Sequence, residues 1–234
     1  LSGTNGLNTV REGRVEGESE DGYFGYSLAS GDLDGDGETD LVVGAPGESS
    51  ARGRVYVFAH DTDYADDDLS TGDTTSRPRG VSNTDHLGYS VLVADWDADG
   101  VDELVACAPD SDPSSRSAAS TCYYLLGEDA VDADDDTITT WDSASFTGAA
   151  ASDQLGYGPL SLAAGDLDGD GTVDLALGAP GYDGGGTDGG GVALWSGTAF
   201  SGTNTFAGAD MIVAGDGSLG RALSIDGDVD GDGV

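Results

Sequence analysis

Lysine is absent from this chain of 234 residues, and its strongly basic side chains are eight arginines. Against 45 aspartates and glutamates, they leave a formal net charge of −37. A field of that sign repels phosphate backbones and anionic lipid, which argues against nucleic-acid binding and against adsorption to a membrane surface. Cations are the natural partners, although solubility chemistry suited to a salty habitat also explains the acids outside the motifs described below.

Long apolar runs and cysteines are also scarce. The chain has no stretch of about 18 apolar residues, the length needed to span a membrane as a helix, and no basic-then-apolar leader follows Leu1. Its two cysteines, Cys107 and Cys122, fall on two runs that we expect to be neighbouring strands. A disulfide would indicate an oxidising compartment, whereas two buried free thiols would not, and the sequence leaves both readings open.

One unit recurs along the chain. It reads FGYSLASGDLDGDGETDLVVGAP from residue 24, LGYSVLVADWDADGVDELVACAP from residue 87 and LGYGPLSLAAGDLDGDGTVDLALGAP from residue 155, and it begins again as LGRALSIDGDVDGDGV at residue 219. Short β-rich runs bounded by Gly and Pro flank each acidic stretch, and helical spacing is missing. Each unit has room for four short strands, and such units bury their faces by stacking on their neighbours.

The repeat predicts an all-β fold, a β-propeller of four-stranded antiparallel blades, seen as a partial fragment of about three and a half blades. Residues 1–234 would be one partial propeller domain, and we expect both ends to be cut. The expected divisions are residues 1–19 as the end of a preceding blade, 20–82, 83–150 and 151–213 as three full repeats, and 214–234 as a truncated fourth.

Each unit carries an acidic loop of the form DxDxDGxx[DE]. Oxygen ligands at positions 1, 3, 5 and 9, with a backbone carbonyl at position 7, can surround Ca²⁺, and glycine at position 6 permits the sharp turn. Magnesium, which demands octahedral geometry, fits less well. The sequence predicts three complete calcium sites and a truncated fourth. Their ligands are Asp32, Asp34, Asp36, Glu38 and Asp40; Asp95, Asp97, Asp99, Val101 and Glu103; Asp166, Asp168, Asp170, Thr172 and Asp174; and Asp228, Asp230 and Asp232.

These loops allow two other readings. One such loop alone could be a solvated turn, since Asp and Gly are favoured there for local reasons, but four in register are different. An EF-hand would need a bidentate Glu at position 12 and flanking helices. Position 12 is occupied by Val43, Ala106 and Leu177, inside the strands that follow, so a site in a β-hairpin is favoured.

The residues Phe24-Gly25 and Gly44-Ala45-Pro46 around the acidic loop resemble the FG-GAP repeat of integrin α-subunit propellers and many bacterial surface proteins. The resemblance covers nearly the whole chain. It implies a propeller with calcium between the first and second strands of each blade and with ligand-binding loops on the opposite face. Those loops would be residues 47–52, 110–120 and 181–189. The chain departs from the pattern where Leu87, Leu155 and Leu219 replace Phe and Cys107 replaces the first Gly of GAP.

No catalytic set emerges from the sequence. His60 and His86 lie in polar segments with no nucleophile pattern, so we predict that both are surface residues. The acids that recur by position are already needed as metal ligands. We predict that Trp96 packs beneath its loop. The tyrosines that follow each FG or LG pair, which we assign to the repeat's structure, are Tyr26, Tyr89 and Tyr157.

We therefore expect a calcium-binding, non-enzymatic, secreted or cell-surface module for adhesion or for interaction with a protein or glycan. The resemblance implies that this partner binds the face opposite the calcium loops. Two alternatives stay open. One is the accessory propeller portion of a secreted polysaccharide lyase or lipase-like enzyme, and the other is a calcium-stabilised spacer within a longer surface protein.

Overall fold

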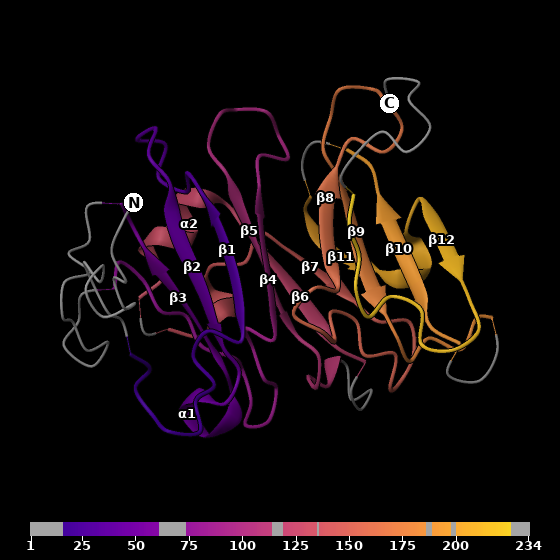
Figure 1. The fold of residues 1–234 in the computed structure, drawn as a ribbon, viewed down its shortest axis with the longest axis horizontal. Helices are drawn as coiled ribbons and strands as arrows, with labels where there is room; N and C mark the ends of the chain where they lie inside the picture. The colour runs from indigo at the N-terminus through magenta and orange to yellow at the C-terminus, as the bar shows by residue number, and fades with distance from the viewer. Residues whose placement is uncertain are drawn as a thin grey trace, which may run out of the picture.

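The computed structural model describes residues 16–60, 74–113, 119–134, 136–185, 189–197 and 200–225. They form three β-sheets that stand side by side (Figure 1), antiparallel except where one strand joins the second sheet. Neighbouring sheets pack face to face in the manner of propeller blades. The prediction of an all-β fold of propeller type is confirmed.

The three sheets follow one another along the chain. The first has the order β1 (Ser27–Gly31), β2 (Asp40–Ala45) and β3 (Arg54–Phe58). The second has the order β11 (Gly202–Thr205), β7 (Ala144–Thr147), β6 (Thr121–Leu125), β5 (Glu103–Ala108) and β4 (Ser90–Ala94). The third has the order β12 (Met211–Ala214), β10 (Gly191–Trp195), β9 (Asp174–Ala179) and β8 (Leu162–Gly165). The helical pieces are short: α1 (Glu48–Ala51), α2 (Gly127–Asp132) and the 3-10 turns Ile138–Thr140 and Phe206–Gly208.

The strand count differs between sheets because the connections along their outer edges differ. In the first sheet the fourth strand is reduced to two antiparallel bridges, Arg54 with Arg79 and Val57 with Ser76. In the second sheet β11 adds a fifth strand, parallel to β7. The chain therefore leaves the third sheet after β10, pairs with the edge of the second, and returns as β12. Repeat spacing in the sequence carried no sign of this crossing.

The core lies between the sheets. One cluster joins the first and second sheets through residues such as Leu33, Val57 and Leu104, and another joins the second and third through Trp96, Leu155 and Leu177. Burial on both faces explains why β3, β5 and β6 read as continuous runs instead of alternating ones.

Trp96 is the largest fully buried side chain among the described residues, at 1% exposure. Its ring packs edge-on against Tyr124 and Phe200, with centroids 5.9 and 6.4 Å away. The predicted packing role is confirmed, and the structure adds that Trp96 joins the core shared with the third sheet.

Cys107 and Cys122 face each other across β5 and β6 and form a disulfide. This settles the alternative that the sequence left open. The bridge lies against Gly156 at the start of the third repeat, where a Cβ would come within 2.6 Å of Cys107 Sγ. Gly156 also has a φ of +73°, so glycine is required there by backbone conformation and by space.

The tyrosines that follow each FG or LG pair form a ladder across the three sheets. The ring centroids of Tyr26 and Tyr89 are 4.6 Å apart, and those of Tyr89 and Tyr157 are 4.9 Å apart. Arg221 stands where the fourth unit would have its tyrosine, and its guanidinium carbon lies 6.0 Å from the centre of the Tyr157 ring. The ladder links successive repeats, as the assignment of these tyrosines to the repeat's structure predicts.

A carboxylate holds the turn that leads into each sheet, but its source changes. In the second and third repeats it comes from the turn itself, where Asp85 accepts from the Ser82 amide and Asp153 from the Ala150 amide, both at 2.6 Å. In the first repeat the corresponding residue is Gly22, and the buried carboxylate of Glu48 takes its place.

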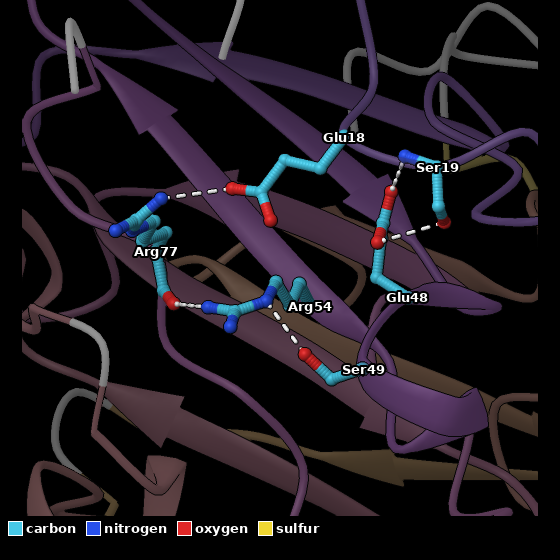
Figure 2. A network of polar contacts seen from close by, with 6 residues as sticks. All are labelled: Glu18, Ser19, Glu48, Ser49, Arg54 and Arg77. Carbon is cyan, nitrogen blue, oxygen red and sulfur yellow. Dashed lines mark hydrogen bonds and ion pairs between the residues drawn. The ribbon is translucent and has the colours of Figure 1, made fainter. Parts of the chain in front are cut away.

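Glu48 reaches this turn from α1. It accepts hydrogen bonds from the amide and the hydroxyl of Ser19, both at 3.0 Å (Figure 2). Beside it, Arg77 Nη1 donates to Glu18 Oε1 and Arg54 Nε donates to Ser49 Oγ, both at 2.8 Å. These contacts tie the entry of the first repeat to the outer edge of its own sheet.

Candidate metal centres

Three acidic loops occupy the same place in the three sheets. They join β1 to β2, β4 to β5 and β8 to β9, and all three lie along the upper edge of the molecule in Figure 1. The helix α1, which follows β2, lies at the lower edge. The loops therefore gather on one face because each sheet has the same topology and the same orientation.

The three loops share one pattern of internal hydrogen bonds. The glycine at position 6 donates to the carboxylate at position 1, at distances of 2.9, 3.1 and 2.9 Å in Gly37, Gly100 and Gly171. The amide at position 5 donates to the carboxylate at position 3, and the amide at position 7 donates to the carboxylate at position 5. The carboxylates at positions 1, 3 and 5 are thereby tied to the backbone of their own turn.

The structure brings together most of the predicted side-chain ligands. Carboxylate oxygens lie within 4.8 Å of one another in each loop, and the three groups are Asp32, Asp34 and Asp36; Asp95, Asp97 and Asp99; and Asp166, Asp168 and Asp174. The first two groups comprise positions 1, 3 and 5, and the third comprises positions 1, 3 and 9.

The third group omits Asp170, which accepts an additional hydrogen bond from the side chain of Thr172. Asp170 Oδ1 accepts from the Thr172 hydroxyl at 2.6 Å and from the Thr172 amide at 2.8 Å. The Thr172 hydrogen bonds also lower the pKa of Asp170. The first and second loops have Glu38 and Val101 at this position, neither of which carries a hydroxyl group.

The carboxylates at position 9 lie underneath the loops. Asp40, Glu103 and Asp174 are 0%, 2% and 3% exposed, and each accepts from the amide at position 2 at 2.8 to 2.9 Å. Burial raises the pKa of all three, against the effect of those amides. For Glu103, burial together with the charges of Asp97, Asp95 and Asp99 raises the pKa to about 7. A divalent cation placed among these groups would stabilise their ionised forms.

One oxygen in each loop is buried without a hydrogen-bond partner among the described residues. These atoms are Asp32 Oδ1, Asp95 Oδ1 and Asp174 Oδ1. A buried acceptor of this kind is unfavourable unless something else binds it. Hard carboxylate oxygens are the ligands that Ca²⁺ takes, so the donor set fits that ion.

Several predicted ligands remain outside this geometry. Glu38, Val101 and Thr172 were predicted to offer backbone carbonyls, and what the structure records for them is donation by their amides. Their role as ligands stays a prediction. The fourth loop, with Asp228, Asp230 and Asp232, lies outside the described residues.

Asp102, at position 8 of the second loop, belongs to no predicted ligand set, yet it contacts the first loop. Its Oδ2 accepts from the Asp32 amide at 2.8 Å, and its own amide donates to the Asp32 carbonyl at 2.7 Å. The corresponding residues of the other loops are Thr39 and Val173. An acid at a position that is otherwise uncharged was the signal that could have singled it out.

The opposite ends of the same strands carry the loops that the resemblance assigns to ligand binding. A polar cavity of about 190 Å³ lies there, between residues 81–85 and 110–113. His86 lies beside this cavity and is half-buried, and its Nδ1 is 2.8 Å from Asp110 Oδ2. His60 is exposed, as predicted. Residues 114–118 and 186–188 of the predicted ligand-side loops lie outside the described residues.

Comparison with known proteins agrees with this architecture. The FG-GAP repeat model matches residues 24–58 and 158–195. The phosphatidylinositol-glycan-specific phospholipase D of Dictyostelium discoideum is 28% identical over 195 residues, which are 77% of this chain and 20% of that protein. Integrin alpha-PS2 of Drosophila melanogaster is 30% identical over 71% of this chain and 11% of its own length. Integrin alpha-5 of Xenopus laevis is 31% identical over 69% of this chain and 14% of its own length.

Stacked antiparallel sheets with an acidic hairpin loop at the same place in each define a repeat protein of the propeller class. The chain carries FG-GAP repeats, and its relatives include integrin alpha chains. It spans a fifth or less of the length of these three relatives. Across the described ranges, no helix is long and apolar enough to cross a membrane.

Proposed function

We propose that this chain is a calcium-binding propeller segment that serves as a non-catalytic, extracellular module for adhesion or for interaction with a protein or glycan. The observation that carries the proposal is the buried, unpartnered carboxylate oxygen found in each of the three acidic loops. Calcium in each loop would bind that oxygen and remove the repulsion among the surrounding carboxylates. The ion would then fix the hairpin that joins the first two strands of each sheet.

Several observations support the extracellular part of the proposal. The Cys107–Cys122 disulfide is typical of proteins from oxidising compartments. Two of the relatives named above are integrin alpha chains. Millimolar calcium outside cells would keep weak sites of this kind occupied. The proposed surface for the partner is formed by the loops at residues 47–52, 110–120 and 181–189, whose described parts lie at the ends of the strands opposite the acidic loops.

Calcium titration with thermal melting tests the metal sites. We expect three ions to bind the described loops and the melting temperature to rise, since binding at 100 times the dissociation constant stabilises a fold by about 2.7 kcal/mol per site. Magnesium at the same concentration should have little effect. Asp34→Ala should remove one ion and leave the other loops occupied.

A matched control lies in the same loop. Glu38→Ala removes a carboxylate of the same charge from a position where only the carbonyl is a predicted ligand, so the number of bound ions should not change. An unchanged calcium stoichiometry in Asp34→Ala would count against the site. Absence of any calcium-dependent melting shift would leave the loops as solvated turns and would end the calcium proposal.

The similarity to phosphatidylinositol-glycan-specific phospholipase D favours a second candidate, the accessory propeller portion of a larger enzyme. On that reading the chain alone still has no hydrolytic activity, because the recurring acids serve the loops. Assays of the isolated chain against lipid and polysaccharide substrates should show no turnover with calcium present. Turnover that is lost on substitution of any described carboxylate would overturn the non-catalytic proposal.

A further inference from the structure

We infer that Asp102 is a positioning residue that couples the first acidic loop to the second, so that calcium in one loop strengthens calcium binding in the other. The inference rests on the calcium binding proposed above. Asp102 would bind no ion itself. It would act through Asp32, the first ligand of the neighbouring loop.

The contact is a pair of hydrogen bonds between two loops 70 residues apart in the chain. The Asp32 amide donates to Asp102 Oδ2, and the Asp102 amide donates to the Asp32 carbonyl. Both bonds fix the backbone of Asp32, whose Oδ1 is the buried, unpartnered acceptor of the first loop. Asp102 lies between Val101 and Glu103, two predicted ligands of the second loop, so its position depends on how that loop is ordered.

A second contact joins the same loops. The side chain of Val101 packs so closely on Gly35 that a Cβ there would lie 2.9 Å from Val101 Cγ2. Gly35 stands between Asp34 and Asp36, two further ligands of the first loop. The two loops also share a cavity of about 260 Å³ that is lined by carboxylates from both, including Asp34 and Asp97.

The neighbouring interface provides an internal comparison. Gly31 leaves space for Asp102, because a Cβ at that position would lie 2.2 Å from Asp102 Oδ2. In the second repeat the corresponding residue is Ala94, and position 8 of the third loop is Val173. Both pack against the apolar cluster of that interface. Among the described residues, no hydrogen bond joins Val173 to Asp95, so the second and third loops lack this contact.

The coupling arises because an ion orders the loop that binds it. Without an ion, the carboxylates of a loop repel one another and the loop samples more conformations, so binding costs conformational entropy. Calcium in the second loop would fix Asp102 and with it the Asp32 backbone, so less order remains to be gained when the first loop binds its own ion. The direct effect of charge has the opposite sign, and salt at about 0.15 M screens it beyond a Debye length of about 8 Å.

The test is a calcium titration of the full chain followed by NMR at 0.15 M salt. The amides of Gly37, Gly100 and Gly171 report each loop separately, because each donates to the first carboxylate of its own loop. We expect Asp97→Ala, which disables the second loop, to weaken binding at the first loop about tenfold, within the range known for coupled sites. By reciprocity, Asp34→Ala should weaken the second loop by the same factor.

Three comparisons assign the coupling to Asp102. Asp168→Ala, the equivalent change in the third loop, should leave the first loop unaffected. In the background of Asp102→Ala, the first loop should already bind about tenfold more weakly, and Asp97→Ala should then have no further effect. Asp102→Asn keeps an acceptor oxygen at the same place, so it should preserve the coupling. Normal titration of Gly171 would show that each variant is folded.

The possible results separate the two proposals. If all three loops bind calcium and Asp97→Ala changes the first loop by less than about twofold, the coupling is wrong and the calcium sites stand. The coupling is also wrong if it survives Asp102→Ala, or if Asp102→Asn abolishes it in a folded protein. If no loop binds calcium, the proposed function fails, and the coupling fails with it.

Discussion

The contact between the first and second sheets and the contact between the second and third follow one backbone plan with different chemistry at the loops. In both, the serine that begins the first strand of one sheet donates its hydroxyl to a glycine carbonyl just before the next sheet. Ser27 donates to Gly88 at 2.8 Å, and Ser90 donates to Gly156 at 2.9 Å. At the loops, the first contact uses the polar pair of Asp32 and Asp102, and the second uses the apolar side chain of Trp96.

The repeat sets where the sheets meet, while single variable positions set how strongly their loops interact. Position 2 of the loop shows the part that the following sheet plays. Leu33 and Trp96 are 0% and 1% exposed because each packs into the core shared with the next sheet, whereas Leu167 is 45% exposed because no further sheet follows it among the described residues. The same motif position is therefore buried wherever a following sheet covers it.

The largest expected effect is at Trp96. Trp96→Ala should lower the free energy of unfolding by about 3–5 kcal/mol, and Leu33→Ala by about 2–5 kcal/mol, because each leaves a cavity between two sheets. Leu167→Ala, the same position in the third loop, should change it by less than about 1 kcal/mol. Urea denaturation in the presence of chelator measures these differences without a contribution from bound metal. Equal losses of unfolding free energy in Trp96→Ala and Leu167→Ala would contradict this prediction.

The shared serine contacts should have a smaller and equal effect. Ser27→Ala and Ser90→Ala should each lower the free energy of unfolding by about 1–2 kcal/mol, because a buried hydrogen bond across the interface is lost. Ser201→Ala, at an exposed position, should stay within about 0.5 kcal/mol. The same denaturation experiment applies. A loss at only one of the two serines would show that the common plan does not hold both interfaces.

The smallest expected effect is a pH dependence that distinguishes the position-9 carboxylates. The folded-state pKa of Glu103 is raised by burial to about 7 from its ordinary value of 4.5, so protonation favours the folded, metal-free chain. This contribution is fully present below the unfolded pKa and is lost as the pH rises through 7. Between pH 8 and pH 6 it should amount to about 1 kcal/mol.

Glu103→Gln should remove that contribution. Chemical denaturation of the chelated protein at several pH values measures it, and saturating calcium should suppress it if the ion holds Glu103 ionised. Asp40→Asn serves for comparison, because the Asp40 carboxylate accepts two backbone amides, from Leu33 and His60, which oppose the rise in its pKa. An identical pH profile in Glu103→Gln and the unsubstituted chain would contradict the prediction.

Much of the candidate site could be predicted because the information is local. A run such as residues 32–40 forms a turn that its own glycines permit, and this turn brings its carboxylates together. The spacing alone therefore indicates which oxygens meet. The absence of Asp170 from the third cluster also has a local cause, because Asp170 accepts a hydrogen bond from the Thr172 hydroxyl. That detail depends on a rotamer, which the motif does not specify.

Contacts between segments far apart in the chain could not be predicted in the same way. The repeat pattern does not predict that Glu48 fills the space left at Gly22, or that β11 joins the edge of the second sheet. The sequence leaves the disulfide open for the same reason, because strand register decides whether Cys107 and Cys122 face each other. These features depend on which surfaces the stacked sheets bring together.

From the sequence we could predict the all-β repeat, the three acidic hairpin loops and the assignment of the tyrosines to the repeat, because each follows from residues close together in the chain. The tertiary structure alone decided which loop residues are buried, which carboxylate oxygens lack a partner and which loops touch. The physical reason is that burial and hydrogen bonding across an interface depend on the neighbouring sheet. The Asp102 contact with Asp32 exists only because two turns 70 residues apart are packed side by side.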